Sequence, residues 1–466
     1  MSYVLCLDCG ATNVRAMLVD EKGAIAAKAS QPNSTDPGAE NPQYHVWNVD
    51  RIFSQLAECT RQALQQVDAA QVRGITITTF GVDGALVDAE GQLLYPVISW
   101  KCPRTAEVMK HIEKYLPQRR LNAISGVGEF AFNTLYKLIW LRENRPELLE
   151  QAHAWLFISN ILAHRLTGVL ATDRTMAGTS QMTDLATGDW SEEILSAIGV
   201  RKTLFPPMVN AGDTIGTLTP AAAEQLGLPA GVPVISAGHD TQFALFGSGV
   251  KENQPFLSSG TWEILMLRTA HAKLDDSDYA AGATVEYDSR EGLLNPGLQW
   301  IASGIIEWVK ATCYKGESYD VMDAEAAAIP PGCEGVSLTP DFLPSDPVPG
   351  AITGLILGRT RGHIYRAAME ALTLRLKQRL EKLEKVGGFK ATELLLVGGG
   401  ARNKIWTQMR ADTLGIPIWV CKVSESTVLG AAMYAFAGAG VYTSPEAARE
   451  AFGIDYELVY PTTAGA

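Results

Sequence analysis

Residues 3–20 read YVLCLDCGATNVRAMLVD, and residues 255–267 read PFLSSGTWEILML. Both stretches follow one plan, in which an apolar strand leads through a turn of small and polar residues into a second apolar strand. In each, the turn places backbone N–H groups and a hydroxyl at the end of a hairpin, which suits a phosphate. One such turn is weak evidence of function. Its recurrence at the head of each half of a 466-residue chain indicates two related units.

Outside the two hairpins, helical and strand patterns alternate along the chain. The expected helices are residues 49–67, 134–144, 362–386 and 406–414, and the expected strands are residues 72–79, 232–236 and 393–397, with a further hairpin at 81–94. Alternation of this kind predicts mixed α/β domains with largely covered sheets. The pattern is interrupted at residues 245–255, and the chain is too long for one core. We therefore predict two domains, residues 1–248 and 249–466.

Composition narrows the possible partners. A net charge of −12 and a pI near 5.2 argue against a general affinity for nucleic acid. No apolar run is long enough to span a membrane, and the first residues lack the features of a secretion signal. Seven cysteines, an odd number spread over the chain, suit reduced thiols in a cytoplasm. The sequence leaves a homodimer open.

Cys6 and Cys9 have the C-x-x-C spacing of metal and redox sites. They lie in a strand pattern, however, where residues three apart point to opposite faces. No second C-x-x-C completes a zinc set. We favour two buried structural thiols.

The first hairpin carries the groups that phosphoryl transfer needs around a nucleotide. Asp8 ends the first strand, where a carboxylate can hold Mg²⁺ directly or through waters; the alternative is a turn cap. Thr12 and Asn13 offer hydrogen bonds to terminal phosphates. Arg15 offers a cation, although it equally suits a solvated strand residue.

Asp240 follows the strand at 232–236 in the sequence Ala-Gly-His-Asp-Thr (237–241). A glycine before a carboxylate at a strand's carboxyl end lets backbone and side chain approach a ligand. Asp240 is therefore our candidate general base for the attacking hydroxyl. His239 is the rival, because histidine is the commonest acid–base residue. A loose transition state needs only late proton removal, so we interpret His239 as a substrate hydrogen-bonder or a structural histidine.

Asp83 lies between two glycines in TTFGVDG (78–84), where a carboxylate can bind paired hydroxyls of a polyol. The alternative is a plain Asp-Gly turn. Trp100, Lys101 and Arg104 follow and suit the same pocket.

Gly398, Gly399 and Gly400 follow the strand at 393–397 and precede Asn403 and a helix. Glycines there let an adenine ring lie against backbone. The run is neither a Walker A loop nor G-x-G-x-x-G, so it supports neither a P-loop kinase nor a Rossmann dehydrogenase.

Two longer patterns make the whole chain resemble the FGGY carbohydrate kinases: FNTLYKLIWLREN (132–144) and GAITGLILGRTRGHIYRAAME (350–370). Both look like the signatures of that family with no position missing. The resemblance implies two ribonuclease-H-like (actin-like ATPase) α/β domains with an interdomain cleft, and ATP and Mg²⁺ as cofactors. It further implies a small sugar as substrate.

Within the family, the chain is most similar to members that phosphorylate the ketose L-fuculose, through residues 78–88, 95–105, 123–138, 236–249 and 257–266. This likeness implies that Asp240 accepts the proton. The resemblance assigns six residues to the nucleotide: Thr12, Asn13, Thr261, Gly399, Gly400 and Asn403. Arg15 and Gly260 join this predicted nucleotide set from their places at the two hairpins. Similarity to the L-rhamnulose-phosphorylating members assigns four residues, beside Asp83, to the sugar: Gly81, His239, Thr241 and Asn295.

The chain departs from its relatives at two places. Ser303 replaces a glutamine that contacts the nucleotide in the L-rhamnulose-phosphorylating members. Residues 99–105, SWKCPRT, replace an acidic form found in many others. Two alternatives stay open: a kinase for another ketose such as L-rhamnulose, and a silent sugar-sensing or filament-forming protein of the actin-like superfamily. Retention of both Asp8 and Asp240 argues against the silent alternative.

Overall fold

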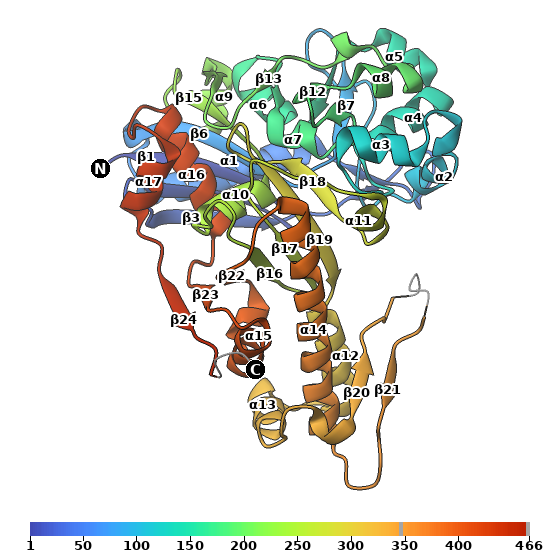
Figure 1. The fold of residues 1–466 in the computed structure, drawn as a ribbon. Coiled ribbons are helices and arrows are strands. Elements are labelled where there is room, and N and C mark those ends of the chain that lie inside the picture. Colours follow the sequence, from blue (N-terminus) through green and yellow to red (C-terminus); the bar gives the residue numbers. More distant parts are fainter. Residues whose placement is uncertain (344–347, 463–466) are drawn as a thin grey trace. The chain divides into compact units, whose positions relative to one another are not determined.

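The computed structural model describes residues 1–343 and 348–462, which form two compact units (Figure 1). Unit 1 comprises Met1–Gly249, Thr284–Leu294 and Glu425–Ile454. Unit 2 comprises Val250–Ala283, Asn295–Ser424 and Asp455–Ala466. Each unit is thus assembled from separate stretches of chain, which a single sequence boundary at residue 248 does not express. The functional division into residues 1–248 and 249–466 stays a prediction.

Unit 1 is built on a six-stranded sheet, and the site residues of this unit lie at its edge. Its strand order is β14 (Thr214–Thr217), β15 (Pro233–His239), β6 (Val72–Thr79), β1 (Tyr3–Cys9), β2 (Asn13–Asp20) and β3 (Ile25–Pro32). β1 and β15 both run parallel to β6, whereas β1 and β2 form an antiparallel hairpin. Helix α16 (Ser426–Gly438) packs against β6 and β1, and α1 (Val49–Ala63) packs against β2 and β3. The central strands β1, β2 and β6 are almost wholly buried because helices cover the sheet, whereas β3 and β14 at its two sides are partly exposed.

Unit 2 repeats the central part of this arrangement. The hairpin of β16 (Phe256–Ser259) and β17 (Trp262–Met266) lies beside β22 (Leu394–Val397), which runs parallel to β16. The sheet continues on one side with β19 (Leu294–Ile301) and on the other with β23 (Ile418–Cys421) and β24 (Tyr456–Val459). A parallel strand beside the first strand of a hairpin is therefore common to both units, as the repeated sequence pattern predicts.

The long helix α14 (Arg361–Gly387) packs against several other elements of unit 2. It packs against α12 (Ser303–Cys313), α15 (Lys404–Leu414) and strand β20 (Ser337–Thr339), and Figure 1 shows it running beside them. It ends at Gly388, whose left-handed φ of 65° favours glycine. The predicted fold class, mixed α/β with two actin-like domains, is confirmed.

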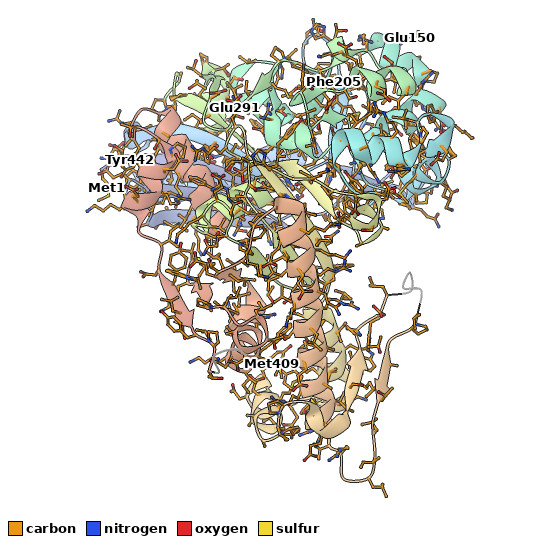
Figure 2. The ribbon with its side chains drawn as sticks, in the orientation of Figure 1. Met1, Glu150, Phe205, Glu291, Met409 and Tyr442 are labelled. Carbon is orange, nitrogen blue, oxygen red and sulfur yellow. The ribbon has the colours of Figure 1, made fainter. Side chains whose placement is uncertain are left out.

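Most expected elements are found at or near their predicted bounds. The strand at 72–79 and the helix α4 (Thr134–Asn144) match residue for residue. The expected hairpin at 81–94 is found in part. β7 (Gly84–Val87) pairs along its length with β9 (Ala154–Phe157), and the returning chain is held by the Val87–Leu93 bridge and by a bond from the Leu94 amide to the Leu86 carbonyl at 2.9 Å. The side chains are drawn in Figure 2, where Met409 marks α15 and Tyr442 follows α16. Within the described ranges, no helix has the length and apolar character needed to cross a membrane.

Candidate active site

The turn between β1 and β2 closes tightly, because the Gly10 amide donates to the Asn13 carbonyl at 2.9 Å. The strand register sets Asp8 opposite Arg15, and Arg15 Nε donates to Asp8 Oδ2 at 2.7 Å. A second carboxylate, Glu425 of unit 1, accepts from Arg15 Nη1 at 2.8 Å. The predicted phosphate turn is therefore flanked by a cation held between two acids.

These groups line a pocket of about 600 Å³ within unit 1. Its lining residues are Asp8, Gly10, Thr12, Asn13, Arg15, Met17, Lys28, Ala29, Ser30 and Glu425. Thr12 and Asn13 are exposed at the tip of the turn, as a ligand-binding role requires. Burial lowers the pKa of Arg15, but Asp8 and Glu425 outweigh it and raise that pKa above its ordinary value. The sequence analysis did not assign Lys28 or Glu425 to this site.

Asp240 is the first residue of α10 (Asp240–Gly247) and directly follows β15. Because β1, β6 and β15 are neighbouring parallel strands, their carboxyl ends bring Asp8 and Asp240 to one edge of the sheet. The Asp240 side chain is 34 % exposed, which leaves it accessible to a ligand. Burial raises its pKa, and the charge of Asp8 adds to this effect while that of His239 opposes it.

His239 lies between two carboxylates. Its Nε2 is 3.4 Å from Asp240 Oδ1, and its Nδ1 is 3.5 Å from Glu286 Oε2. Burial lowers the pKa of His239, but Glu286 and then Asp240 outweigh it and raise that pKa above its ordinary value. The imidazole is thus oriented with one nitrogen toward each acid.

The sequence analysis missed Glu286. It belongs to β18 (Thr284–Tyr287), in the short segment that the second half of the chain contributes to unit 1. The Val285 amide donates to the Gly126 carbonyl at 2.8 Å, and Gln242 Nε2 donates to Glu286 Oε2 at 2.7 Å. Glu286 carries no motif, and it lies 47 residues after His239 in the sequence. Only tertiary structure brings the two together.

Gly81 packs directly against the His239 ring. A Cβ at Gly81 would lie 3.1 Å from His239 Nε2 and 3.1 Å from the Thr179 methyl, which is closer than ordinary contact. Thr241 follows Asp240 directly, and its hydroxyl donates to Asp240 Oδ1 at 3.3 Å. The structure therefore brings Gly81, His239, Asp240 and Thr241 together.

Asp83 is fully buried in unit 1, with an exposed fraction of 0 %. Its Oδ1 forms an ion pair with the equally buried Lys137, and its Oδ2 accepts from Trp47 Nε1 at 2.6 Å and from the Trp100 amide at 3.0 Å. Burial raises the pKa of Asp83 against the lowering effect of Lys137. Both carboxylate oxygens are thus bound by protein donors, and the predicted sugar contact stays a prediction.

The three residues expected beside Asp83 have different surroundings. Trp100 is 37 % exposed, and Lys101 Nζ lies 3.5 Å from the Ala11 carbonyl in the phosphate turn. Arg104 is buried, with its guanidinium 4.0 Å from the Tyr44 ring centroid and 4.8 Å from that of Trp140. Lys101 thus lies near the turn, whereas Arg104 belongs to an aromatic cluster.

In unit 2, the predicted nucleotide residues lie around β16. The Gly260 carbonyl accepts from the Ser303 amide at 3.2 Å, and the Thr261 carbonyl accepts from the Ala302 amide at 3.0 Å. Gly398 has a φ of 93°, and a Cβ there would be only 2.5 Å from the Ser259 carbonyl oxygen. Gly400 is also crowded by the Ser259 hydroxyl, whereas nothing crowds Gly399. The glycines at 398–400 thus allow this segment to approach the segment at Ser259 until the two backbones are in contact.

Asn403 has a structural role at the start of α15. Its Oδ1 accepts from the Trp406 amide at 2.9 Å, and its Nδ2 donates to Asp323 Oδ1 at 2.9 Å and to the Tyr365 hydroxyl at 2.8 Å. Asn295 is buried in β19, where Nδ2 donates to the Leu267 carbonyl at 3.0 Å. It belongs to unit 2, whereas the other predicted sugar residues belong to unit 1.

The described residues contain no cluster of three or more His, Cys, Asp or Glu side chains arranged to hold a metal. Mg²⁺ does not require such a cluster, because its sites usually combine one or two carboxylates with phosphate oxygens. Asp8 can supply one such carboxylate: it lines the pocket beside the turn, where its side chain is 7 % exposed and paired with Arg15. The donor set therefore fits a magnesium ion that arrives with a nucleotide.

Two family models match nearly the whole chain. The N-terminal domain of the FGGY family of carbohydrate kinases matches residues 3–247, and the C-terminal domain of that family matches residues 256–439. The protein belongs to the FGGY family of carbohydrate kinases.

Curated relatives cover the chain over its full length. The chain is 54 % identical to L-fuculokinase of Escherichia coli K12 over 461 residues, which are 99 % of this chain and 97 % of the relative. It is 44 % identical to L-fuculokinase of Haemophilus influenzae, over 99 % of this chain and 100 % of the relative. Xylulose kinase from Rhodospirillum rubrum has the same fold, with a TM-score of 0.90 at 23 % identity over 99 % of this chain and 95 % of that one.

Proposed function

We propose that this carbohydrate kinase transfers the γ-phosphoryl group of ATP to O1 of L-fuculose, giving L-fuculose 1-phosphate and ADP. The observation that carries the proposal is the 54 % identity to an L-fuculokinase over 99 % of the chain. The geometry supports it, because the strands that lead into Asp240 and into the Asp8–Arg15 hairpin flank the same strand, β6, and run parallel to it. The reaction would belong to fucose metabolism. A cytoplasmic location fits the seven free cysteines.

Asp240 is the proposed general base. The O1 oxygen attacks the γ-phosphorus, the bond from that phosphorus to the β,γ-bridging oxygen breaks, and the O1 proton passes to an Asp240 carboxylate oxygen. A loose transition state makes positioning and charge more important than early deprotonation. Asp240 suits this role because its carboxylate is partly exposed at the start of α10.

The proposed nucleotide contacts of unit 1 belong to its hairpin. Thr12 and Asn13 would donate to the terminal phosphates, and Arg15 would add a cation. Asp8 would hold Mg²⁺, which offsets the charge of the phosphates when bound. In unit 2, we propose that the adenosine part of ATP contacts a surface formed largely by backbone. The residues of this surface are Gly260, Thr261, Gly399, Gly400 and Asn403.

The sugar contacts are proposed around His239. Gly81 would face the sugar through its backbone, with His239 and Thr241 as hydrogen-bond partners, and a sugar contact of Asn295, in unit 2, stays a prediction of the sequence. Glu286 would hold the imidazole so that Nε2 faces the substrate and the base. Asp83 would act by fixing the backbone of Trp100, and direct bonds from its oxygens to sugar hydroxyls stay a prediction of the sequence.

A coupled ADP-release assay over a panel of ketoses tests the substrate. We expect kcat/KM to be highest for L-fuculose, lower for D-ribulose, and lowest for L-rhamnulose. D-ribulose lacks only the terminal methyl group, worth about 1 kcal/mol. An epimer leaves a buried hydrogen-bonding group unpaired, at about 1–3 kcal/mol per lost bond, or roughly ten- to a hundredfold. A kcat/KM for L-rhamnulose equal to that for L-fuculose would contradict the assignment within the family.

Replacing Asp240 tests the catalytic role. Asp240→Asn keeps the size of the side chain and removes its basicity, so we expect kcat to fall by about 10²–10⁴-fold. ATP binding, measured by calorimetry, should change little, because a base acts in the transition state. Turnover within about tenfold of the wild type would exclude Asp240 as the base.

A further inference from the structure

The strand that delivers Asp240 is irregular immediately before it. β15 pairs with β6 in regular register at Val234 and Ile235, but the register shifts before the pairing resumes at Gly238. Three steps along β15, from Ile235 to Gly238, oppose two steps along β6, from Thr76 to Thr78. This is a β-bulge. Bulges bend a strand and re-aim the side chains that follow.

Gly238 gives the bulge its shape. Its φ of 117° lies in a region that only glycine adopts readily. A Cβ at Gly238 would overlap the carboxylate of Asp173, which lies directly against the glycine. The bulge is thus shaped around a second acid that the proposed reaction does not use.

Three buried side chains hold the bulge in place, and we call them the Asp173 cluster: Asp173, Thr175 and Ser236. Ser236 Oγ donates to Asp173 Oδ2 at 2.6 Å, and the Thr175 hydroxyl donates to Asp173 Oδ1. That hydroxyl in turn accepts from the backbone amide of His239 at 2.9 Å. A chain of hydrogen bonds therefore runs from Asp173 to the residue that precedes Asp240.

Asp173 is itself firmly fixed. Its Oδ1 accepts from the amides of Thr175 at 2.8 Å and Met176 at 3.1 Å, which caps α7 (Arg174–Gly178). The exposed fraction of Asp173 is 1 %. Burial raises its pKa to about 6, against the lowering effect of Ser236 and Thr175. A small cavity of about 10 Å³ is lined by Asp173, Ser236 and Gly238 together with residues of α6 (Ile158–Thr167), and the Asp173 amide donates to Asn160 Oδ1 of that helix at 3.3 Å.

We propose that Asp173 is a positioning residue for the phosphoryl transfer: through Thr175 it holds the His239 amide, and thereby sets the place of the Asp240 carboxylate. The role rests on the proposed function of Asp240 as base. A cap for α7 alone would not require the additional bond to His239, nor a glycine packed against the carboxylate. Misplacing a reacting group by about 1 Å can cost on the order of 100-fold in rate.

Two isosteric substitutions separate positioning from stability. Thr175→Val removes the hydroxyl that binds the His239 amide. Thr76→Val is the matched control: Thr76 is also fully buried, and its hydroxyl donates to β15 at the Ile235 carbonyl, 2.9 Å away, on the other side of the bulge. Both variants lose a hydrogen bond to β15, and Thr175→Val loses the bond to Asp173 as well, so the free energy of unfolding of both variants is measured beside kcat. Thr175→Ser keeps the hydroxyl and serves as the rescue.

We expect Thr175→Val to lower kcat by about tenfold or more, with the KM for ATP unchanged. Thr76→Val and Thr175→Ser should stay within about threefold of the wild type. Amide hydrogen exchange at His239, measured without substrate, should accelerate in Thr175→Val and stay slow in Thr76→Val. If Thr175→Val does not fold, Ser236→Ala tests the same cluster from the other oxygen of Asp173.

The outcomes separate this proposal from the proposed function. If Asp240→Asn is inactive while Thr175→Val and Thr76→Val have equal kcat, the positioning role is wrong and the base stands. If Asp240→Asn keeps full turnover, the base assignment is wrong. If the wild type phosphorylates no ketose, the exchange of the His239 amide still decides whether the cluster holds the bulge. Equal exchange in the two valine variants would overturn the proposal.

Discussion

The two hairpins of this protein share one backbone plan and use their acids in opposite ways. In unit 1, the acid of the hairpin is Asp8, which pairs with Arg15 at the wall of an open pocket. In unit 2, the acid is Glu263 on β17, which pairs with Arg410 of α15 inside the core, both with an exposed fraction of 0 %. The hairpin itself therefore dictates neither role.

The difference follows from register. In β1, the acid is two residues before the turn glycine, opposite Arg15 on the neighbouring strand. In β17, the acid comes three residues after Gly260 and pairs across the hairpin with Ser259, whose hydroxyl donates to it at 2.9 Å. Successive residues of a strand face opposite sides of the sheet, so a shift of one position moves a charge from a pocket into a core. The position of Asp8 places its carboxylate at the pocket, where it can contact a ligand. The position of Glu263 places its carboxylate in the core, where it stabilises the turn through its bond to Ser259.

The largest expected effect concerns the buried pair. Arg410→Met removes the cation and leaves the Glu263 carboxylate buried without its partner. We expect the free energy of unfolding to fall by about 3–5 kcal/mol, measured by urea denaturation. A double variant, Arg410→Met with Glu263→Gln, should recover part of that loss because no charge remains unpaired. If the single variant is as stable as the wild type, the Glu263–Arg410 pair does not stabilise the fold, and the proposed contrast between the two hairpins is wrong.

The second prediction concerns the open pair. Asp8→Asn should lower kcat by about 100-fold, equivalent to about 2.7 kcal/mol, because the proposed magnesium ligand loses its charge. The free energy of unfolding should fall by only about 1 kcal/mol, since Arg15 keeps its bond to Glu425 and is partly solvated. Activity is measured at increasing Mg²⁺ concentrations. A loss of stability as large as that of Arg410→Met, with normal kcat, would make Asp8 a structural residue.

The two hairpins could be predicted from the sequence, and the reason is local, whereas the burial of Glu263 with Arg410 was not predicted. The hairpins, the strand at 72–79 and the helix at 134–144 all depend on contiguous apolar patterns and turn residues. The neighbourhood of Asp8 and Asp240 follows from strand ends in a parallel sheet. A local sequence pattern is therefore enough to predict which residues are close together when that closeness depends only on which strands are adjacent in the sheet.

The partners of the site residues could not be predicted in this way. Glu286 reaches His239 through a segment that leaves unit 2 and returns to unit 1, and nothing in its sequence marks it. The buried ion pair of Asp83 with Lys137 joins two motifs whose contact depends on the packing of α4. Residues 81–94 form only part of the expected hairpin, because β7 pairs along its whole length with β9, a strand far away in the sequence. Such contacts are decided by tertiary packing rather than by local propensity.

The smallest expected effect concerns the residue before the turn glycine, which is Cys9 in unit 1 and Ser259 in unit 2. Cys9 packs into the main core of unit 1, whereas Cys6 contacts the Val428 carbonyl in α16 at 3.7 Å, so the two thiols lie on opposite faces of β1. Burial raises the pKa of both thiols, with a further contribution from Asp8, and this disfavours the thiolate that a metal requires.

Purified protein should therefore contain no stoichiometric zinc by elemental analysis. A Cys6→Ala/Cys9→Ala double variant should keep kcat within about twofold and lose about 1–2 kcal/mol of unfolding free energy, as expected for two small buried side chains. One zinc per chain, with activity lost on its removal and absent from the double variant, would make the first hairpin a metal site of a kind that the second hairpin cannot form.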